Sequence, residues 1–158
     1  MKKVVKVMLP LLFAAASFAQ STTWLRIVGV ITAPGVQNPV GNIPSGGLPW
    51  TTTSGIATVN LTDGTVAFAV EGLVLVGGNA SGAPDGVTSV KGTLACNVGT
   101  ADQVNIDTPA VPLSPQGNAL FSGSFLSALP PSCINSPVFL IRVANATGAW
   151  IATGAVRL

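Results

Sequence analysis

The sequence predicts an all-β protein, and three observations favour that class. Gly and Pro recur throughout the chain, and Thr and Val dominate the stretches between them. No stretch after residue 19 shows a sustained helical period with capping residues. Short alternating runs instead return about every 8–12 residues, a spacing typical of sandwiches. We therefore expect an antiparallel β-sandwich of about seven or eight strands.

The first strand is expected at residues 24–32, and a long loop follows at residues 33–53. This loop contains Pro34, Pro39, Pro44 and Pro49. Each proline lacks the backbone N–H that a central strand donates to its ladder, so the segment is not expected to form one.

The clearest element is a hairpin over residues 55–73, GIATVNLTDGTVAFAVEGL. Ala57, Val59 and Leu61 alternate with polar residues and are expected to face the core. Asp63-Gly64 predicts a two-residue turn, because this pair tolerates the positive φ angles that suit the twist of paired strands. The inward residues of the second strand are Val66, Phe68 and Val70.

Further strands are expected at residues 87–96, 104–111, 118–126, 138–144 and 149–157, of which 104–111 has the weakest pattern. Short links join them, so neighbouring strands are expected to run antiparallel.

The first 19 residues read as a secretory signal peptide. Lys2, Lys3 and Lys6 form a basic start, residues 7–16 are mostly apolar, and Ser17-Phe18-Ala19 is a small-x-small cleavage site. The alternative is an uncleaved membrane anchor, but a spanning helix needs about 20 apolar residues. We expect a single domain over residues 20–158 in the periplasm or outside the cell. The Met-Lys-Lys start is typical of bacterial exports.

Removal of the signal peptide changes the charge balance. Four cations, Arg26, Lys91, Arg142 and Arg157, then face five carboxylates, a net charge of −1. Nucleic-acid binding needs a basic patch, so this class is excluded. Charged residues make up only 8% of the chain, and weak charge repulsion makes self-association an expected property.

Cys96 and Cys133 are the only cysteines. In an exported chain an even number of cysteines indicates disulfide bonding, and two cysteines allow one internal pair. The bridge is expected to fasten the loop before residue 138 to the sandwich.

The composition restricts catalysis. Without His, a Ser–His–Asp site and the usual zinc ligand sets are excluded, and Tyr is absent as well. A hydrolase would need two carboxyl groups across a cleft. The available carboxylates are Asp63, Glu71, Asp85, Asp102 and Asp107. Asp102, Asn105 and Asp107 have the spacing nearest to a calcium site, but no known calcium-loop pattern supports it, and a solvated loop is favoured. We therefore expect no metal and no cofactor.

Trp50 is the only candidate for ligand contact. It follows the Gly- and Pro-rich loop IPSGGLPW, and exposed aromatic rings often bind sugars. The competing interpretation is that Trp50 closes one end of the sandwich, and this one is favoured.

The hairpin resembles the start of the chordin-type CHRD domain. Gly55, Ala57, Leu61, Asp63, Gly64, Gly72 and Leu73 match its pattern, whereas the His-x-His pair usual in that family is missing. The mature chain also resembles small exported bacterial proteins of unknown function. These resemblances imply a secreted β domain, Ig-like or CHRD-like, without a defined activity.

The sequence thus leads to a function hypothesis with two alternatives. The first is a secreted, non-catalytic binding or structural module of the cell envelope or extracellular space, with a protein or glycan partner at the cell surface. The alternatives are a carbohydrate-binding module that uses Trp50 and a carboxylate-based hydrolase.

Overall fold

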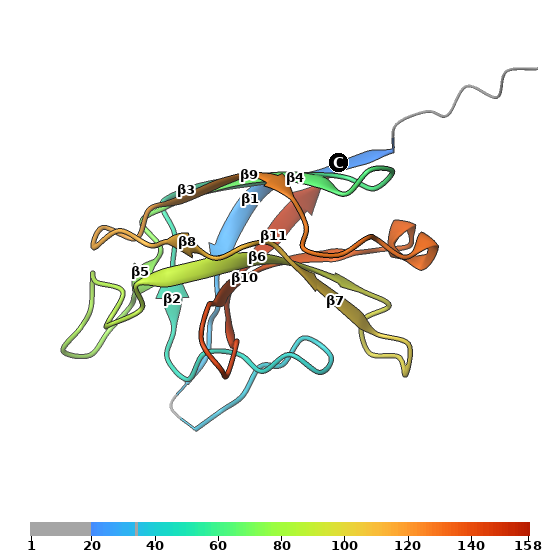
Figure 1. The fold of residues 1–158 in the computed structure, drawn as a ribbon. Coiled ribbons are helices and arrows are strands. Elements are labelled where there is room, and N and C mark those ends of the chain that lie inside the picture. The colour runs from blue at the N-terminus through green and yellow to red at the C-terminus, as the bar shows by residue number, and fades with distance from the viewer. Residues whose placement is uncertain (1–19, 34) are drawn as a thin grey trace, which may run out of the picture.

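A computed structural model describes residues 20–33 and 35–158 of the chain, so the expected signal peptide and Pro34 lie outside the described residues. The fold is all-β, as predicted, and eleven strands and one short 3₁₀ helix follow one another along the chain (Figure 1). The elements are β1 (Ser21–Gly29), β2 (Trp50–Thr51), β3 (Ser54–Asn60), β4 (Thr65–Glu71), β5 (Val74–Leu75), β6 (Ser89–Cys96), β7 (Val104–Asp107), β8 (Val111–Pro112), β9 (Ala119–Ser124), η1 (Pro131–Ile134), β10 (Val138–Val143) and β11 (Trp150–Arg157).

Nine strands form one curled antiparallel sheet, in the order β7-β6-β10-β11-β1-β3-β4-β9, with β8 also paired to β6. The N-terminal and C-terminal strands are therefore neighbours, and Ile27 lies opposite Gly154. The remaining two strands, β2 and β5, pair separately through Trp50 and Leu75. Figure 1 shows β3, β4 and β9 forming one layer, which faces β6 and β10.

The core fills the space inside the curl. Phe68 of β4 packs against Phe139 of β10 with ring centroids 5.8 Å apart, and Trp24 of β1 lies 5.6 Å from Phe139. A Cβ on Gly92 of β6 would lie 2.9 Å from the Phe68 ring and 3.0 Å from the Phe139 ring. Glycine at this position therefore lets the two layers approach closely enough for both rings to pack.

The predicted hairpin is confirmed as β3 and β4, with Ala57, Val59, Val66, Phe68 and Val70 all buried. The expected two-residue turn is wrong, because four residues connect the strands and Gly64 alone among them has a positive φ. The Asn60 side chain causes the difference. Its Oδ1 accepts the backbone N–H groups of Thr62 and Asp63, which closes a local turn before Gly64 is reached.

The proline-rich loop covers the outer face of one part of the sheet. Trp150 of β11 donates its Nε1–H to the Asn38 carbonyl at 2.9 Å, and its backbone N–H binds the Pro44 carbonyl. Ile43 is 1% exposed, and Leu140, between the inward-facing Phe139 and Ile141, is fully buried. Residues 35–49 therefore lie against β11, and Figure 1 shows them at the bottom of the view.

The two edges of the curled sheet, near β7 and β9, come close at their ends but do not form a continuous backbone ladder. At one end the Leu126 N–H binds the Asp107 carbonyl at 2.8 Å, and at the other the Ser114 N–H binds the Asn118 carbonyl at 3.0 Å. Between these points no backbone hydrogen bond joins β9 to residues 108–113 in the described chain. Pro109 and Pro112 have no N–H to offer, which accounts for the open stretch.

Candidate functional site

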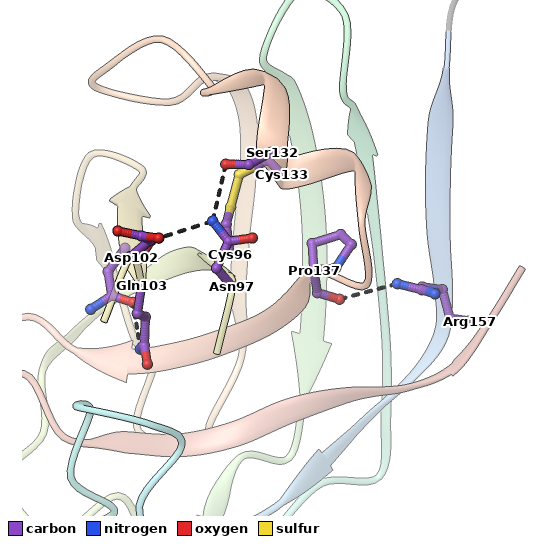
Figure 2. Close-up of a disulfide and its surroundings, with 9 residues drawn as sticks. Cys96, Asn97, Asp102, Gln103, Ser132, Cys133, Pro137 and Arg157 are labelled. Atoms are coloured by element: carbon purple, nitrogen blue, oxygen red, sulfur yellow. Dashed lines mark hydrogen bonds between the residues drawn. A yellow bond between two sulfur atoms is a disulfide. The ribbon is translucent and has the colours of Figure 1, made fainter. Parts of the chain in front are cut away.

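The cysteines form the predicted bridge. Cys96, at the end of β6, is bonded to Cys133 in η1, and both side chains are buried (Figure 2). Beside it, the Asn97 Nδ2 group donates to the Ser132 hydroxyl at 3.0 Å and to the Asp102 carbonyl at 3.3 Å. The bridge and this side chain fasten the 125–137 segment to the sheet, which is a structural role. A buried disulfide with no free thiol in the described chain offers no nucleophile.

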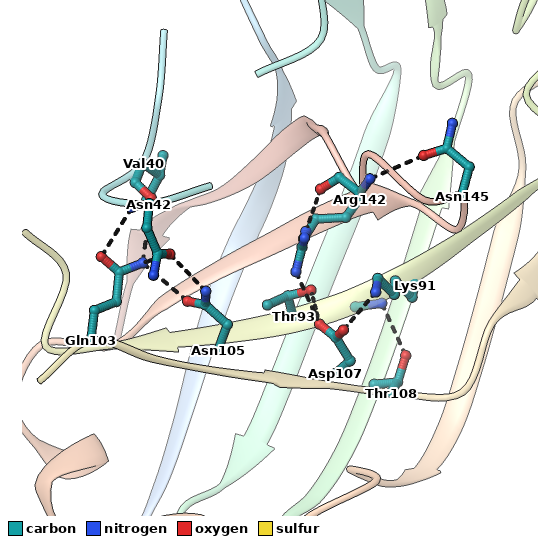
Figure 3. Close-up of polar contacts among 12 residues, drawn as sticks. Val40, Asn42, Lys91, Thr93, Gln103, Asn105, Asp107, Thr108, Arg142 and Asn145 are labelled. Carbon is teal, nitrogen blue, oxygen red and sulfur yellow. Dashed lines mark hydrogen bonds and ion pairs between the residues drawn. The ribbon is translucent and has the colours of Figure 1, made fainter. Parts of the chain in front are cut away.

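Asp107 is the centre of a charged cluster on the outer face of β6, β7 and β10 (Figure 3). Its carboxylate lies 2.6 Å from Lys91 Nζ and 3.3 Å from Arg142 Nη1, and it accepts the Thr93 hydroxyl at 2.6 Å. The Arg142 side chain also donates to the Gly148 carbonyl. Both oxygens of Asp107 are thus engaged within the sheet, whereas the sequence alone favours a solvated loop at this position.

A network of amides lies beside the cluster. Gln103 Nε2 donates to Asn42 and Asn105 at 2.8 and 3.0 Å, and Asn105 Nδ2 donates to Asn42 at 2.8 Å. The network anchors the proline-rich loop of residues 35–49 to β7. A calcium site is not supported by this arrangement, because Asn105 binds amides and Asp107 binds two cations. No three His, Cys, Asp or Glu side chains of residues 20–33 and 35–158 gather as a metal site.

Asp63 and Glu71 also have local partners. Asp63 accepts the backbone N–H and the hydroxyl of Thr65 at 2.8 and 2.7 Å, and these bonds lower its pKa below the ordinary value for aspartate. A carboxylate whose pKa is lowered by folding stabilises the fold above its unfolded pKa, and this stabilisation is lost as the pH falls through the folded pKa. Glu71 accepts the Ser54 hydroxyl at 2.8 Å. Both groups stabilise the hairpin.

Asp85 and Asp102 complete the set of carboxylates. The side-chain oxygens of both residues make no hydrogen bond or ion pair within the described chain. Asp102 lies in the exposed turn after Cys96. Asp85 starts a tight turn with Gly86, in which both residues have positive φ and the Val87 N–H binds the Pro84 carbonyl. Asp85 borders two hollows of the surface.

Trp50 lies in β2 with 7% of its surface exposed. Its backbone pairs with Leu75 of β5, and its N–H binds the Val30 carbonyl. A sugar-stacking platform needs an open ring face. The burial of Trp50 therefore favours the alternative interpretation, in which the indole closes one end of the core.

The surface above Trp50 is hollowed, and we call this region the end cleft. It consists of two adjoining hollows of about 420 and 200 Å³ that share Leu48, Leu75 and Asp85. The larger hollow lies against the glycine-rich loop after β5, and Trp50 lines the smaller one. Leu48 and Val76 are 43% and 47% exposed, so apolar side chains face solvent here.

The end cleft combines two loops on a rigid sheet with an apolar lining and one carboxylate. This combination is usual for a small-molecule site, because apolar contact supplies affinity and a few polar groups supply orientation. Sequence reasoning singles out the loop IPSGGLPW, which contains Leu48, and includes Asp85 among the carboxylates, but it does not predict that the two residues lie at one site. The available signal is an apolar residue, Leu48, between the turn residues Gly47 and Pro49.

A second open region is the outer face of β3, β4 and β9, which the proline-rich loop does not reach. One hollow on it is lined mainly by small or hydroxyl-bearing residues such as Thr58, Ala67 and Ser122, and a second, of about 440 Å³, is lined in part by the half-exposed Leu25 and Ile56. The carboxylate in this second hollow, Glu71, is engaged by the Ser54 hydroxyl and shares the hollow with Arg26, whereas Asp85 has no such partner in the described chain.

No known family model, curated protein sequence or solved structure matches this chain. The similarity of the hairpin to CHRD domains therefore stays a prediction. No helix in the described part of the chain is long and apolar enough to cross a membrane.

Proposed function

We propose that this protein is an exported, non-catalytic binding module and that the end cleft is its binding site. The observation that carries the proposal is the contrast between the cleft and the remaining polar groups. Asp63, Glu71 and Asp107 are engaged in structural hydrogen bonds, and the two cysteines are joined. Within residues 20–33 and 35–158, the end cleft is where exposed apolar side chains and an unpaired carboxylate come together.

The cleft can be tested with a neutral apolar probe, 2-phenylethanol, followed by amide chemical shifts in solution. We expect shifts at Gly77, Gly78 and Val87, and we expect Leu48→Ser to weaken binding about five- to tenfold, because burial of a leucine side chain is worth roughly 1.5–3 kcal/mol when complete and less at a half-exposed site. Leu120→Ser is the matched control, since Leu120 is 72% exposed on the outer face of β3, β4 and β9, away from the end cleft. Equal binding by both variants would contradict the proposal.

The absence of catalysis is tested separately. A hydrolytic activity that disappears in Asp107→Asn or Asp102→Asn, in protein that remains folded, would show that the chain is an enzyme. With no such activity, the carboxylate hydrolase is dismissed.

Export is the second part of the proposal, and it rests on residues 1–19 together with the disulfide. A bond between Cys96 and Cys133 is stable where thiols are oxidised, as outside the cytoplasm. We expect protein recovered from the periplasm or the medium to begin at Gln20, measured as intact mass, and to be lighter by two hydrogens than the dithiol form. A full-length, reduced chain confined to the cytoplasm would contradict export.

A further inference from the structure

We propose that the end cleft selects a small organic cation, an ammonium group attached to a short apolar body. The inference rests on the proposed function, since it names the class of ligand for the same site. It begins with the carboxylate of Asp85, the single ionisable group in the lining of either hollow.

Asp85 has no cation of its own within the described chain. Lys91 and Arg142 are both held by Asp107 at 2.6 and 3.3 Å. Arg157 donates to the Pro137 carbonyl, and Arg26 lines a hollow that contains Glu71. These are the four cationic side chains of residues 20–158, and none of them lines the end cleft.

The remaining lining of the cleft is mostly apolar or backbone. Besides Asp85, the larger hollow is lined by Leu48, Pro49, Leu75 and Val76 and by residues 77–80, among which Asn79 has the one polar side chain. The smaller hollow continues over Trp50, Val87 and Ile151. An apolar body can occupy this surface, and a positive charge attached to it can reach Asp85 at the shared border.

The size of the cleft favours a small molecule over a polymer. A hollow of about 420 Å³ lies within the range of roughly 300–1,000 Å³ that is usual for small-ligand sites. The strands that line the cleft, β2 and β5, offer a peptide no open edge, because the Leu75 N–H and carbonyl already bind Ala83 and Gly82 and the Trp50 N–H binds the Val30 carbonyl. The nearly neutral mature chain adds no strong field, and Asp85 therefore determines the preference for charge.

The inference predicts a modest preference, because Asp85 is exposed and water screens its attraction for a cation. Protonated 2-phenylethylamine is expected to bind about two- to fivefold more tightly than 2-phenylethanol, measured by amide shifts of the disulfide-bonded protein near pH 7. The preference is expected to shrink in about 0.5 M salt, where the Debye length is only a few ångströms.

Matched variants locate the effect. Asp85→Asn is expected to remove the preference for the amine while binding of the alcohol continues, and Asp102→Asn, which changes the other carboxylate without a partner in the described chain, is expected to retain it. If wild-type protein binds the amine and the alcohol equally, or if Asp85→Asn keeps the preference, the cation inference is wrong and the apolar site remains. If neither probe shifts the cleft resonances, the proposed function itself fails.

Discussion

Asp107 shows how a single carboxylate organises the polar side of this molecule. It neutralises two cations from different strands, Lys91 of β6 and Arg142 of β10, and it accepts a threonine hydroxyl. The three charged side chains are between 13% and 25% exposed, so water screens them only in part. Without the carboxylate, two cations would face each other across the sheet.

We therefore expect Asp107→Asn to destabilise the fold by about 1–3 kcal/mol, since the amide keeps one acceptor oxygen, loses the other and no longer neutralises the two cations. The free energy of unfolding in urea at neutral pH measures the effect. Asp102→Asn is the control and is expected to stay within about 0.5 kcal/mol of wild type. A loss of the same size in both variants would show that the ion pairs of Asp107 make no particular contribution to the free energy of unfolding.

For single residues, the sequence predicts composition and the disulfide, but it does not predict which side chains meet in the folded sheet. The absence of His and the pairing of two cysteines follow from composition alone. The partners of Asp107 do not, because Arg142 lies 35 positions away and joins it only through sheet pairing. Trp50 has two interpretations on the sequence, since a tryptophan between loops is compatible with both a platform and a plug, and only its burial separates them.

At the scale of elements, Gly92 determines how closely β6 approaches β4. Its missing side chain leaves room for the rings of Phe68 and Phe139. A methyl group there would overlap both rings, so the two layers would have to separate or the rings would have to leave their positions.

Gly92→Ala is expected to cost about 1–3 kcal/mol of stability, the usual range for an overpacked core. Gly47→Ala is the matched control, because a methyl group added to Gly47 would meet nothing within 4 Å and the φ of this residue is not positive. Thermal unfolding of both variants provides the comparison. A neutral Gly92→Ala would mean that the two layers are not in close contact.

Alternation predicts the long strands well, because one buried face imposes a period of two on the sequence. It does not predict β2, β5 and β8, since two-residue strands are too short to show a period. Nor does it predict that residues 35–49 lie against β11. The hydrogen bonds from Trp150 to Asn38 and Pro44 connect positions more than 100 residues apart, which no local pattern contains.

At the scale of the whole molecule, the disulfide joins two segments that are 37 residues apart in the chain. In the chain-entropy model a loop of this length contributes about 3–4 kcal/mol. Reduction, or the double variant Cys96→Ala/Cys133→Ala, is expected to lower the free energy of unfolding by about that amount. Unfolding curves with and without reductant test this, and the double variant should be insensitive to reductant. Identical curves for oxidised and reduced wild type would contradict it.

The order of the strands determines when the sheet can be completed. In the described sheet β11, which comes last in the strand numbering, links the β7-β6-β10 part to the β1-β3-β4-β9 part. In the proposed export, β11 would follow the other strands across the membrane, so the backbone pairs that link the two parts would form after β11 has emerged. A chain halted before that point would lack the β1–β11 and β10–β11 pairs, and its sheet would be incomplete.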